Sequence, residues 1–307
     1  AYLGLGMNHE TLLAVFRQHN EDYGKQVGKL KSPRSYWKYC TMYKHLSEFV
    51  EKRYKVSDIA LKELTPAFIT DFELFLRVEK NHCNNTVWSY MMPFRKIIYM
   101  AVNNGLLHRD PFFAYSITKE ETKRGFLTQE EIRLLINGTF KKKSYELIRD
   151  LFIFCTFTGL SWTDMANLTK ANLRTSFDGH LWLDTNRQKT GVETNIRLLD
   201  VARHIIEKYD GMAERDKLLP VPCYANCKNG IKAIAKKCGI EKPVSFHLSR
   251  HSFAVMALNY GMPIESVSKI LGHTDIKTTQ IYAKVTNTKL NSDISAFENK
   301  ISGRFDI

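Results

Sequence analysis

The chain has 307 residues, and its 45 lysines and arginines against 32 aspartates and glutamates give a formal charge of +13. This length predicts two domains of about 100–200 residues each. With 44% hydrophobic and 25% charged residues, the composition excludes a disordered or collagen-like chain. No apolar run approaches the ~20 residues that cross a bilayer, and the start AYLGLGMNHE lacks the pattern of a secretory signal. A membrane protein is therefore not expected.

The positive charge favours a nucleic-acid partner, because lysines and arginines that neutralise phosphates release counterions and drive binding. Charge alone does not exclude a basic soluble enzyme with another substrate. Six cysteines are too few for a disulfide scaffold, so reduced thiols in a cytoplasm are the simpler interpretation. The spacing of Cys223, Cys227 and Cys238 lacks a paired C-x2-C, and we predict no metal site.

The first third of the chain predicts a small module of four helices. Apolar residues recur at helical spacing from Ser35 to Tyr54. Thr65-Pro66 supplies an N-cap and a proline at the first helical position, and another helix runs from about Asn85 to Asn104-Gly105. Pro93 predicts a kink there, or a later helix start. The stretch 7–27 is the fourth predicted helix.

A second domain follows a charged linker. We predict a helical domain at 1–110, a linker at 111–125 and a mixed α/β domain at 126–307. Thr128-x-x-Glu131 is a capping box, and the apolar stretch 145–158 predicts the central buried helix. The strands HLWLDT and ETNIRLL flank NRQKTGV, which predicts a β-hairpin. The fold class is therefore mainly α with a small β-sheet.

Five residues of the second domain form a set that suits phosphodiester cleavage. Lys189 lies at the hairpin tip, His247 and Arg250 share one helix face, and His273 follows Gly272. Tyr282 comes nine residues after His273, or about two and a half turns later if that segment is helical. Each alone has a structural explanation, as a cap, a packing residue or an exposed lysine. Together they supply acid–base groups, an anion clamp and a nucleophile.

This set resembles the tyrosine recombinase (phage integrase) family. H-x-x-R, then L-G-H, then the tyrosine nine residues later match the family's boxes, and T-G-L-S-W-T-D-M-A-N-L at 158–168 resembles its first box. FITDFELFLR and NNTVWSYMMPFRKIIYMAVNNG are similar to integrases of Bacteroides-type mobile elements. The resemblance implies a SAM-like core-binding domain followed by a catalytic domain with a C-terminal exchange helix.

One position departs from the family pattern. The first box normally carries an arginine where this chain has Ser161, whereas Asp164 matches the acidic residue that follows. Serine cannot replace a bidentate charged donor. Either the enzyme is slow or inactive, or another cation substitutes, and relatives of the Bacteroides type also lack this arginine.

Our candidate for the substituting cation is Arg187. It comes two residues before Lys189, and the alternation of a strand would point both side chains to one face. Alternatively, Arg187 contacts only a DNA phosphate or solvent.

The resemblance implies the roles of the remaining residues. Tyr282 would attack the scissile phosphate and form a 3′-phosphotyrosine, with neither ATP, metal nor cofactor. Arg250 would clamp the phosphate, Lys189 would protonate the leaving 5′-oxygen, and His247 and His273 would assist proton transfer and bind phosphoryl oxygens. Asp164 would be structural.

The implied partner is double-stranded DNA at attachment or crossover sites, bound by a homotetramer that is monomeric when free, with accessory DNA-bending proteins. The implied location is a bacterial cytoplasm, at the nucleoid. Three alternatives stay open: a weakened DNA-binding regulator descended from a recombinase, a type IB topoisomerase, and a basic RNA-processing enzyme, although no RNA module is recognisable.

Overall fold

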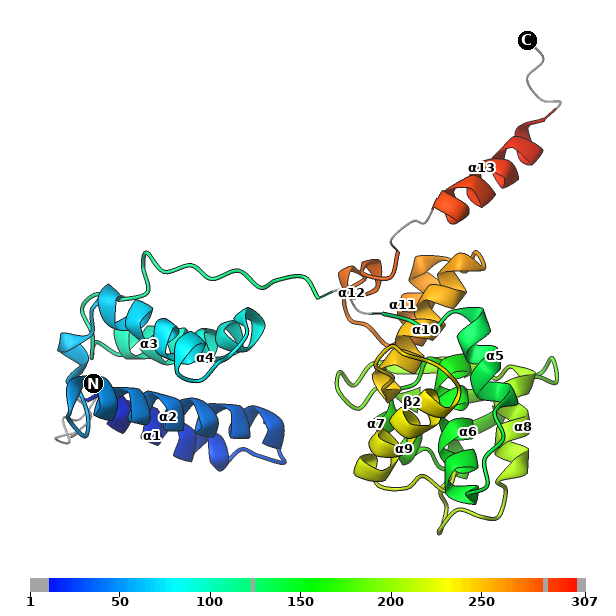
Figure 1. The fold of residues 1–307 in the computed structure, drawn as a ribbon, viewed down its shortest axis with the longest axis horizontal. Coiled ribbons are helices and arrows are strands. Elements are labelled where there is room, and N and C mark those ends of the chain that lie inside the picture. The colour runs from blue at the N-terminus through cyan, green and yellow to red at the C-terminus, as the bar shows by residue number, and fades with distance from the viewer. Residues whose placement is uncertain (1–10, 123–124, 284–286, 303–307) are drawn as a thin grey trace. The chain divides into compact units, whose positions relative to one another are not determined.

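The computed structural model describes residues 11–122, 125–283 and 287–302. The chain divides into two compact units, Ala1–Thr122 and Lys123–Ile307. The first unit runs from blue to cyan in Figure 1 and the second from green to red. Each unit has a hydrophobic core of its own, and most of both is helical. The predicted fold class, mainly α with a small β-sheet, is confirmed.

The first unit is the predicted module of four helices. The helices are Leu12–Gly24 (α1), Pro33–Tyr54 (α2), Pro66–Val78 (α3) and Asn84–Asn103 (α4), with a short 3-10 turn at Leu61–Glu63. In Figure 1, α1 lies along α2 and α3 lies along α4. We predicted a helix over 7–27. The first residues of that range lie outside the described part of the chain, and α1 ends three residues before the predicted end.

Local signals explain where these helices begin. The Thr65 side chain accepts a hydrogen bond from the Phe68 N–H, with Pro66 at the first helical position. Pro93 does not delay α4, so the predicted later start is wrong. Met91 and Phe94, on the two sides of the proline, are both buried. The free energy gained by burying them exceeds the free energy lost with the one hydrogen bond that the proline removes.

The first unit extends past residue 110, where we placed the start of the linker. Phe112 is fully buried, and its ring packs edge-on against Phe94 at 5.1 Å between centroids. Farther along, the Asn85 side chain accepts from the Glu120 N–H at 2.9 Å and donates to the Glu120 carbonyl at 3.1 Å. These contacts fasten the chain to α4 as far as residue 120.

The second unit contains one sheet and nine helices among the described residues. The helices are Gln129–Asn137 (α5), Lys143–Thr158 (α6), Trp162–Asn167 (α7), Asp200–Lys208 (α8), Tyr224–Lys237 (α9), Phe246–Asn259 (α10), Ile264–Ile270 (α11), Lys277–Gln280 (α12) and Asn287–Ile301 (α13), with a 3-10 turn at Lys170–Asn172. Buried α6 packs against α5, α8, α9 and α10 (Figure 1). The predicted central helix is therefore observed.

The sheet has three antiparallel strands in the order β1-β2-β3, which are Leu173–Thr175, Leu181–Asn186 and Glu193–Arg197. Leu183 pairs with both Leu173 and Ile196. The hairpin of β2 and β3 was predicted, and the three-residue β1 was not, because so short a strand has no periodic pattern. The hairpin places Arg187 and Lys189 at its tip.

Candidate active site

Arg250 is the most deeply buried of the predicted site residues that carry a positive charge. It lies on α10 with 2% of its surface exposed. Its Nη1 donates to the Gly159 carbonyl at 2.7 Å, and its Nη2 donates to the Leu271 carbonyl and lies 3.1 Å from His273 Nε2. Burial, followed by the charge of Arg187, lowers the pKa of Arg250 to about 9, and Tyr282 opposes the shift. The guanidinium remains charged at neutral pH in a fixed orientation.

Asp164 connects the first box with the hairpin. Its carboxylate accepts the Ser161 hydroxyl at 2.7 Å and the Gln188 N–H at 3.1 Å. The same carboxylate forms an ion pair with Arg187, and the two side chains are only 2% and 14% exposed. The Ser161 hydroxyl also caps α7 by accepting the Asp164 N–H. Arg187 and the first-box serine therefore share one buried carboxylate.

The charge of Arg187 acts on other predicted site residues. Burial lowers the pKa of its guanidinium, and the neighbouring Tyr282 opposes that shift. Arg187 also lowers the pKa values of Arg250 and His273, so the three groups interact across one site. Strand alternation does not relate Arg187 to Lys189 as predicted, because residues 188–190 form a turn. Lys189 is exposed, and its charge nevertheless contributes to the lowered pKa of His273.

The hairpin tip is docked against the turn that carries His273. The Thr190 hydroxyl donates to the Gly272 carbonyl at 3.2 Å. Gly272 has a φ of +60°, and a Cβ placed there would lie 2.8 Å from Thr194 Cγ2 and 3.1 Å from Arg187 Cβ. Only glycine satisfies both the backbone conformation and this close approach.

His273 is held in one tautomer by its two neighbours. Its Nε2 lies 3.1 Å from Arg250 Nη2, and its Nδ1 lies 2.8 Å from the hydroxyl of Thr279. Because arginine has no acceptor, Nε2 accepts and the Nδ1–H donates to Thr279. Burial, followed by the charges of Arg250, Arg187 and Lys189, lowers the pKa of His273 to about 4. The imidazole is neutral at physiological pH.

Tyr282 follows α12 and is half-buried. It packs against the small apolar cluster built around Phe253 and Leu271. The segment between His273 and Tyr282 is not the continuous helix considered for their spacing, because only Lys277–Gln280 is α-helical there. Tyr282 is nevertheless close enough to Arg187 and Arg250 to oppose the lowering of both of their pKa values.

His247 is exposed on α10, one turn before His251. The two imidazole rings meet edge-to-face with centroids 4.3 Å apart, and the His251 ring lies 4.9 Å from the Tyr282 ring. His251 was missed by the sequence reasoning, although its spacing of four residues from His247 could have indicated a shared helix face.

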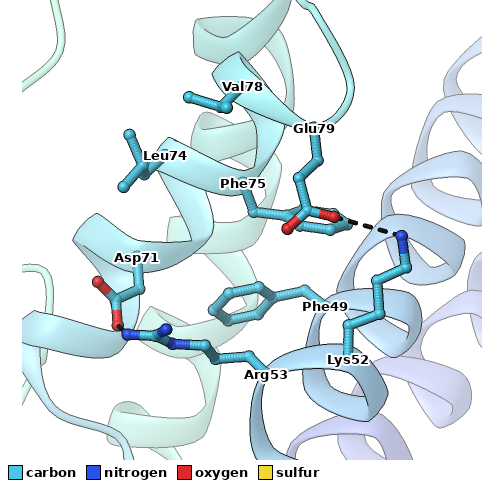
Figure 2. Close-up of a pocket in the computed structure, with 8 residues that line it drawn as sticks. All are labelled: Phe49, Lys52, Arg53, Asp71, Leu74, Phe75, Val78 and Glu79. Carbon is cyan, nitrogen blue, oxygen red and sulfur yellow. Dashed lines mark hydrogen bonds and ion pairs between the residues drawn. The ribbon is translucent and has the colours of Figure 1, made fainter.

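A hollow in the first unit holds no catalytic set. It lies between α2 and α3, where Phe49 and Phe75 form the base and Leu74 and Val78 form the rim (Figure 2). Two ion pairs bridge it, Lys52–Glu79 at 3.2 Å and Arg53–Asp71 at 3.4 Å. The residues that line it include no nucleophile beside an acid–base pair.

Within the described residues, no cluster of three or more histidines, cysteines or acidic residues is arranged to hold a metal ion. All six cysteines are free thiols. In the described part of the chain, none of the helices combines the length and apolarity that a membrane crossing requires.

A helical module followed by a mixed domain with a tyrosine in a cationic site is the architecture of the tyrosine recombinases. Residues 11–117 match the family model of the phage integrase SAM-like domain, and residues 125–289 match that of the phage integrase family. The second match alone covers more than half of the chain. The chain therefore belongs to the phage integrase family and is a site-specific DNA recombinase of the tyrosine type.

Individual relatives agree with this assignment. The tyrosine recombinase XerD of Listeria monocytogenes serotype 4b (strain F2365) is 28% identical over 247 residues, covering 75% of this chain and 81% of the relative. The integrase of Escherichia phage P2 is 30% identical over 182 residues, covering 58% of this chain and 48% of the integrase. The first is named a tyrosine recombinase and the second an integrase.

Solved structures share the fold. The Tn1549 transposon integrase in complex with transposon right end DNA has a TM-score of 0.70 at 15% identity, covering 93% of this chain and 99% of that one. A lambda integrase dimer bound to a COC′ core site has a TM-score of 0.69 at 15% identity, covering 89% and 95%. The similarity spans both units of the chain.

Proposed function

We propose that this recombinase cuts and rejoins DNA at the attachment sites of a mobile element, with Tyr282 as the nucleophile. The observation that carries the proposal is that α10 brings the groups together: Arg250 lies 3.1 Å from His273, and the next residue, His251, meets the Tyr282 ring with centroids 4.9 Å apart. The Tyr282 oxygen attacks phosphorus, the bond to the 5′-oxygen breaks, and a 3′-phosphotyrosine forms. The 5′-hydroxyl of another strand reverses the step, so no nucleotide cofactor is consumed.

Proton transfers follow from the positions of Lys189 and His247. Lys189, exposed at the hairpin tip, protonates the departing 5′-oxygen, a task that suits a mobile ammonium group. His247 assists the loss of the Tyr282 proton and binds a phosphoryl oxygen. Arg250, oriented by two backbone carbonyls, is the phosphate clamp.

Arg187 takes the place of the missing first-box arginine. Its ion pair with Asp164 anchors it beside Ser161, the position from which the family's arginine would extend. Asp164 is then a structural residue whose role is to hold a guanidinium. This arrangement favours an active enzyme over a decayed regulator, because the second cation of the site is present and reaches it from the hairpin.

His273 changes its role when a phosphate arrives. Without DNA, its Nε2 accepts from Arg250. A phosphate between these two residues would take over the guanidinium donor, and its negative charge would raise the imidazole pKa enough for Nε2 to take up a proton. The protonated Nε2 would then donate to a phosphoryl oxygen. DNA binding is therefore accompanied by proton uptake.

The assembly and location extend the proposal. Four protomers on two duplexes would exchange the C-terminal helix α13, with a monomer in free solution and accessory DNA-bending proteins on the element ends. Because the substrate is chromosomal or element DNA, the protein would act in a bacterial cytoplasm, at the nucleoid.

Covalent capture tests the function and finds the target sequence in one experiment. The protein is incubated with fragmented genomic and element-end DNA, denatured, and recovered with any DNA that remains attached. We expect the wild type to retain DNA with a common junction sequence and Tyr282→Phe to retain none while binding DNA normally. DNA attached to Tyr282→Phe, or a wild type that captures nothing, would refute the proposal; the second result would favour a DNA-binding regulator.

A plasmid assay with the same protein distinguishes recombination from relaxation of supercoils. Incubated with a plasmid that carries two captured sites, a recombinase yields deletion or inversion products. A type IB topoisomerase would relax plasmids without a site and would exchange no strands.

A further inference from the structure

Three aromatic rings contact one another in sequence: His247, His251 and Tyr282. The ring of His247 meets His251 edge-to-face with centroids 4.3 Å apart and planes at 77°. The ring of His251 meets Tyr282 with centroids 4.9 Å apart and planes at 53°. His251 is only 3% exposed, so it stands in the interior between an exposed histidine and the tyrosine.

The chain around Tyr282 provides little rigidity of its own. The preceding helix α12 has four residues, and the Tyr282 N–H donates to the Thr279 carbonyl at 3.0 Å in a single turn. The phenol packs instead on a cluster whose members include Phe253 of α10. Its position is therefore set largely by side chains of α10.

Arg250 and His251 are consecutive residues of that helix. Arg250 is tied to the carbonyls of Gly159 and Leu271, so α10 holds the proposed phosphate clamp in a fixed position. His251, the next residue, touches the proposed nucleophile. One rigid element thus relates the position of the phenol to the position of the phosphate it would attack.

We propose that His251 is a positioning residue that orients the Tyr282 ring relative to Arg250, an inference that rests on the proposed function. Its ring supplies a wall for the phenol and transmits no charge to the substrate. Misplacement of a reacting atom by about 1 Å can cost on the order of 10²-fold in rate. Loss of the wall therefore slows nucleophilic attack and leaves DNA binding intact.

The test measures single-turnover cleavage of a duplex that carries the site recovered by covalent capture. We expect His251→Ala to slow formation of the covalent complex by about 30–100-fold. His251→Phe, which keeps a ring of similar shape, retains the wild-type rate within about threefold and keeps the wild-type pH dependence. DNA affinity is unchanged in both variants. His204→Ala, at an exposed histidine of α8, is the matched control and cleaves normally.

A substrate with sulfur at the 5′-bridging position separates positioning from proton donation. A thiolate leaves without a proton, so this substrate rescues Lys189→Ala but not His251→Ala.

A wild-type rate for His251→Ala, a loss in His251→Phe as large as in His251→Ala, or rescue of His251→Ala by sulfur would each overturn the inference. Should His251→Ala not fold, His251→Phe and His251→Gln decide it, since only the ring-bearing variant is expected to cleave normally. A wild type without any covalent complex would instead refute the proposed function.

Discussion

At the scale of the residue, the carboxylate of Asp164 is buried beside Ser161, the position where this chain lacks the family's first-box arginine. Asp164 has 2% of its side chain exposed, and a carboxylate so deeply buried requires a cation and hydrogen-bond donors. Ser161 supplies a donor and Arg187 supplies the cation. The negative charge of Asp164 is therefore compensated by Arg187.

Arg187→Ala tests that substitution directly. Removal of the cation leaves Asp164 buried without its ion pair and removes the charged donor that we propose for the phosphate. We expect covalent cleavage to slow by about 10²–10³-fold, the typical worth of a preorganised donor to a developing charge, while Arg187→Lys recovers part of the rate.

Arg197, which is exposed on β3 of the same hairpin, provides the matched control. Arg197→Ala keeps the cleavage rate of the wild type in the same single-turnover assay. If Arg187→Ala cleaved DNA as fast as Arg197→Ala, Arg187 would have no place in the active site.

His273 makes stability depend on pH in a defined window. Its pKa is about 4 in the folded chain and about 6.5 when unfolded, so the unfolded state binds the proton more tightly. The contribution of His273 is complete above about pH 6.5 and is lost as the pH falls toward 4. The change is on the order of 2–3 kcal/mol.

Urea unfolding of the wild type and of His273→Gln between about pH 4.5 and pH 7.5 measures this effect. The free energy of unfolding should fall more steeply on acidification for the wild type than for the variant. Parallel curves would show that His273 titrates alike in both states.

At the scale of the element, the tip of the β2–β3 hairpin packs against the turn that carries Gly272 and His273. Alternating residues around a glycine turn predicted the hairpin, but nothing in that pattern indicated the contact with Gly272. The Thr190 hydrogen bond and the approach of Arg187 to Gly272 fix the tip against the turn of His273. Two predicted site residues are thereby brought together from distant segments of the chain.

Gly272→Ala should disturb this docking. The added Cβ would lie 2.8 Å from Thr194 Cγ2, at a φ of +60°, so we expect a loss of about 1–3 kcal/mol in the free energy of unfolding. Cleavage should slow as well, because the hairpin that carries Arg187 must move.

Gly239→Ala is the control that distinguishes backbone strain from a steric clash with neighbouring side chains. Gly239 has a φ of +76° with nothing within 4 Å of an added Cβ, so its substitution costs only the backbone strain. Urea titration should show the larger loss for Gly272→Ala, and only this variant should cleave more slowly. Equal losses and equal rates would mean that the hairpin is not held through Gly272.

At the scale of the whole molecule, the C-terminal helix carries apolar side chains that stay largely exposed. On α13, Leu290, Ile294 and Phe297 are 48%, 46% and 61% exposed. Burying such side chains is worth about 1.5–3 kcal/mol each. A second copy of the chain in the DNA-bound assembly would supply the cover.

Ile294→Gln combined with Phe297→Gln tests the exchange. We expect this double variant to form the covalent complex on a single site but to lose most recombination between two sites, because cleavage uses one chain and exchange uses several. Glu298→Gln on the same helix is the control and recombines normally. Full recombination by the double variant would argue against exchange of α13.

Much of the fold could be predicted because its signals are local. The capping box at Thr128 and Glu131 is observed with both of its hydrogen bonds, and the cap at Thr65 marks the start of α3. The apolar stretch that ends at Thr158 is the buried α6. The strand β1 and the packing of Phe112 depend on contacts with distant residues, and these were missed. For the same reason the sequence did not decide between a kink at Pro93 and a later start of α4.

The sequence alone determined the element types, the two-part organisation and the residue types of a phosphoryl-transfer site, because periodicity, caps and box spacing are properties of neighbouring residues. Only the tertiary structure decided that Arg187 pairs with Asp164, that Arg250 is held by the carbonyls of Gly159 and Leu271, and that His251 stands against Tyr282. These contacts join segments far apart in the chain, and no local pattern specifies which charge a buried carboxylate will meet.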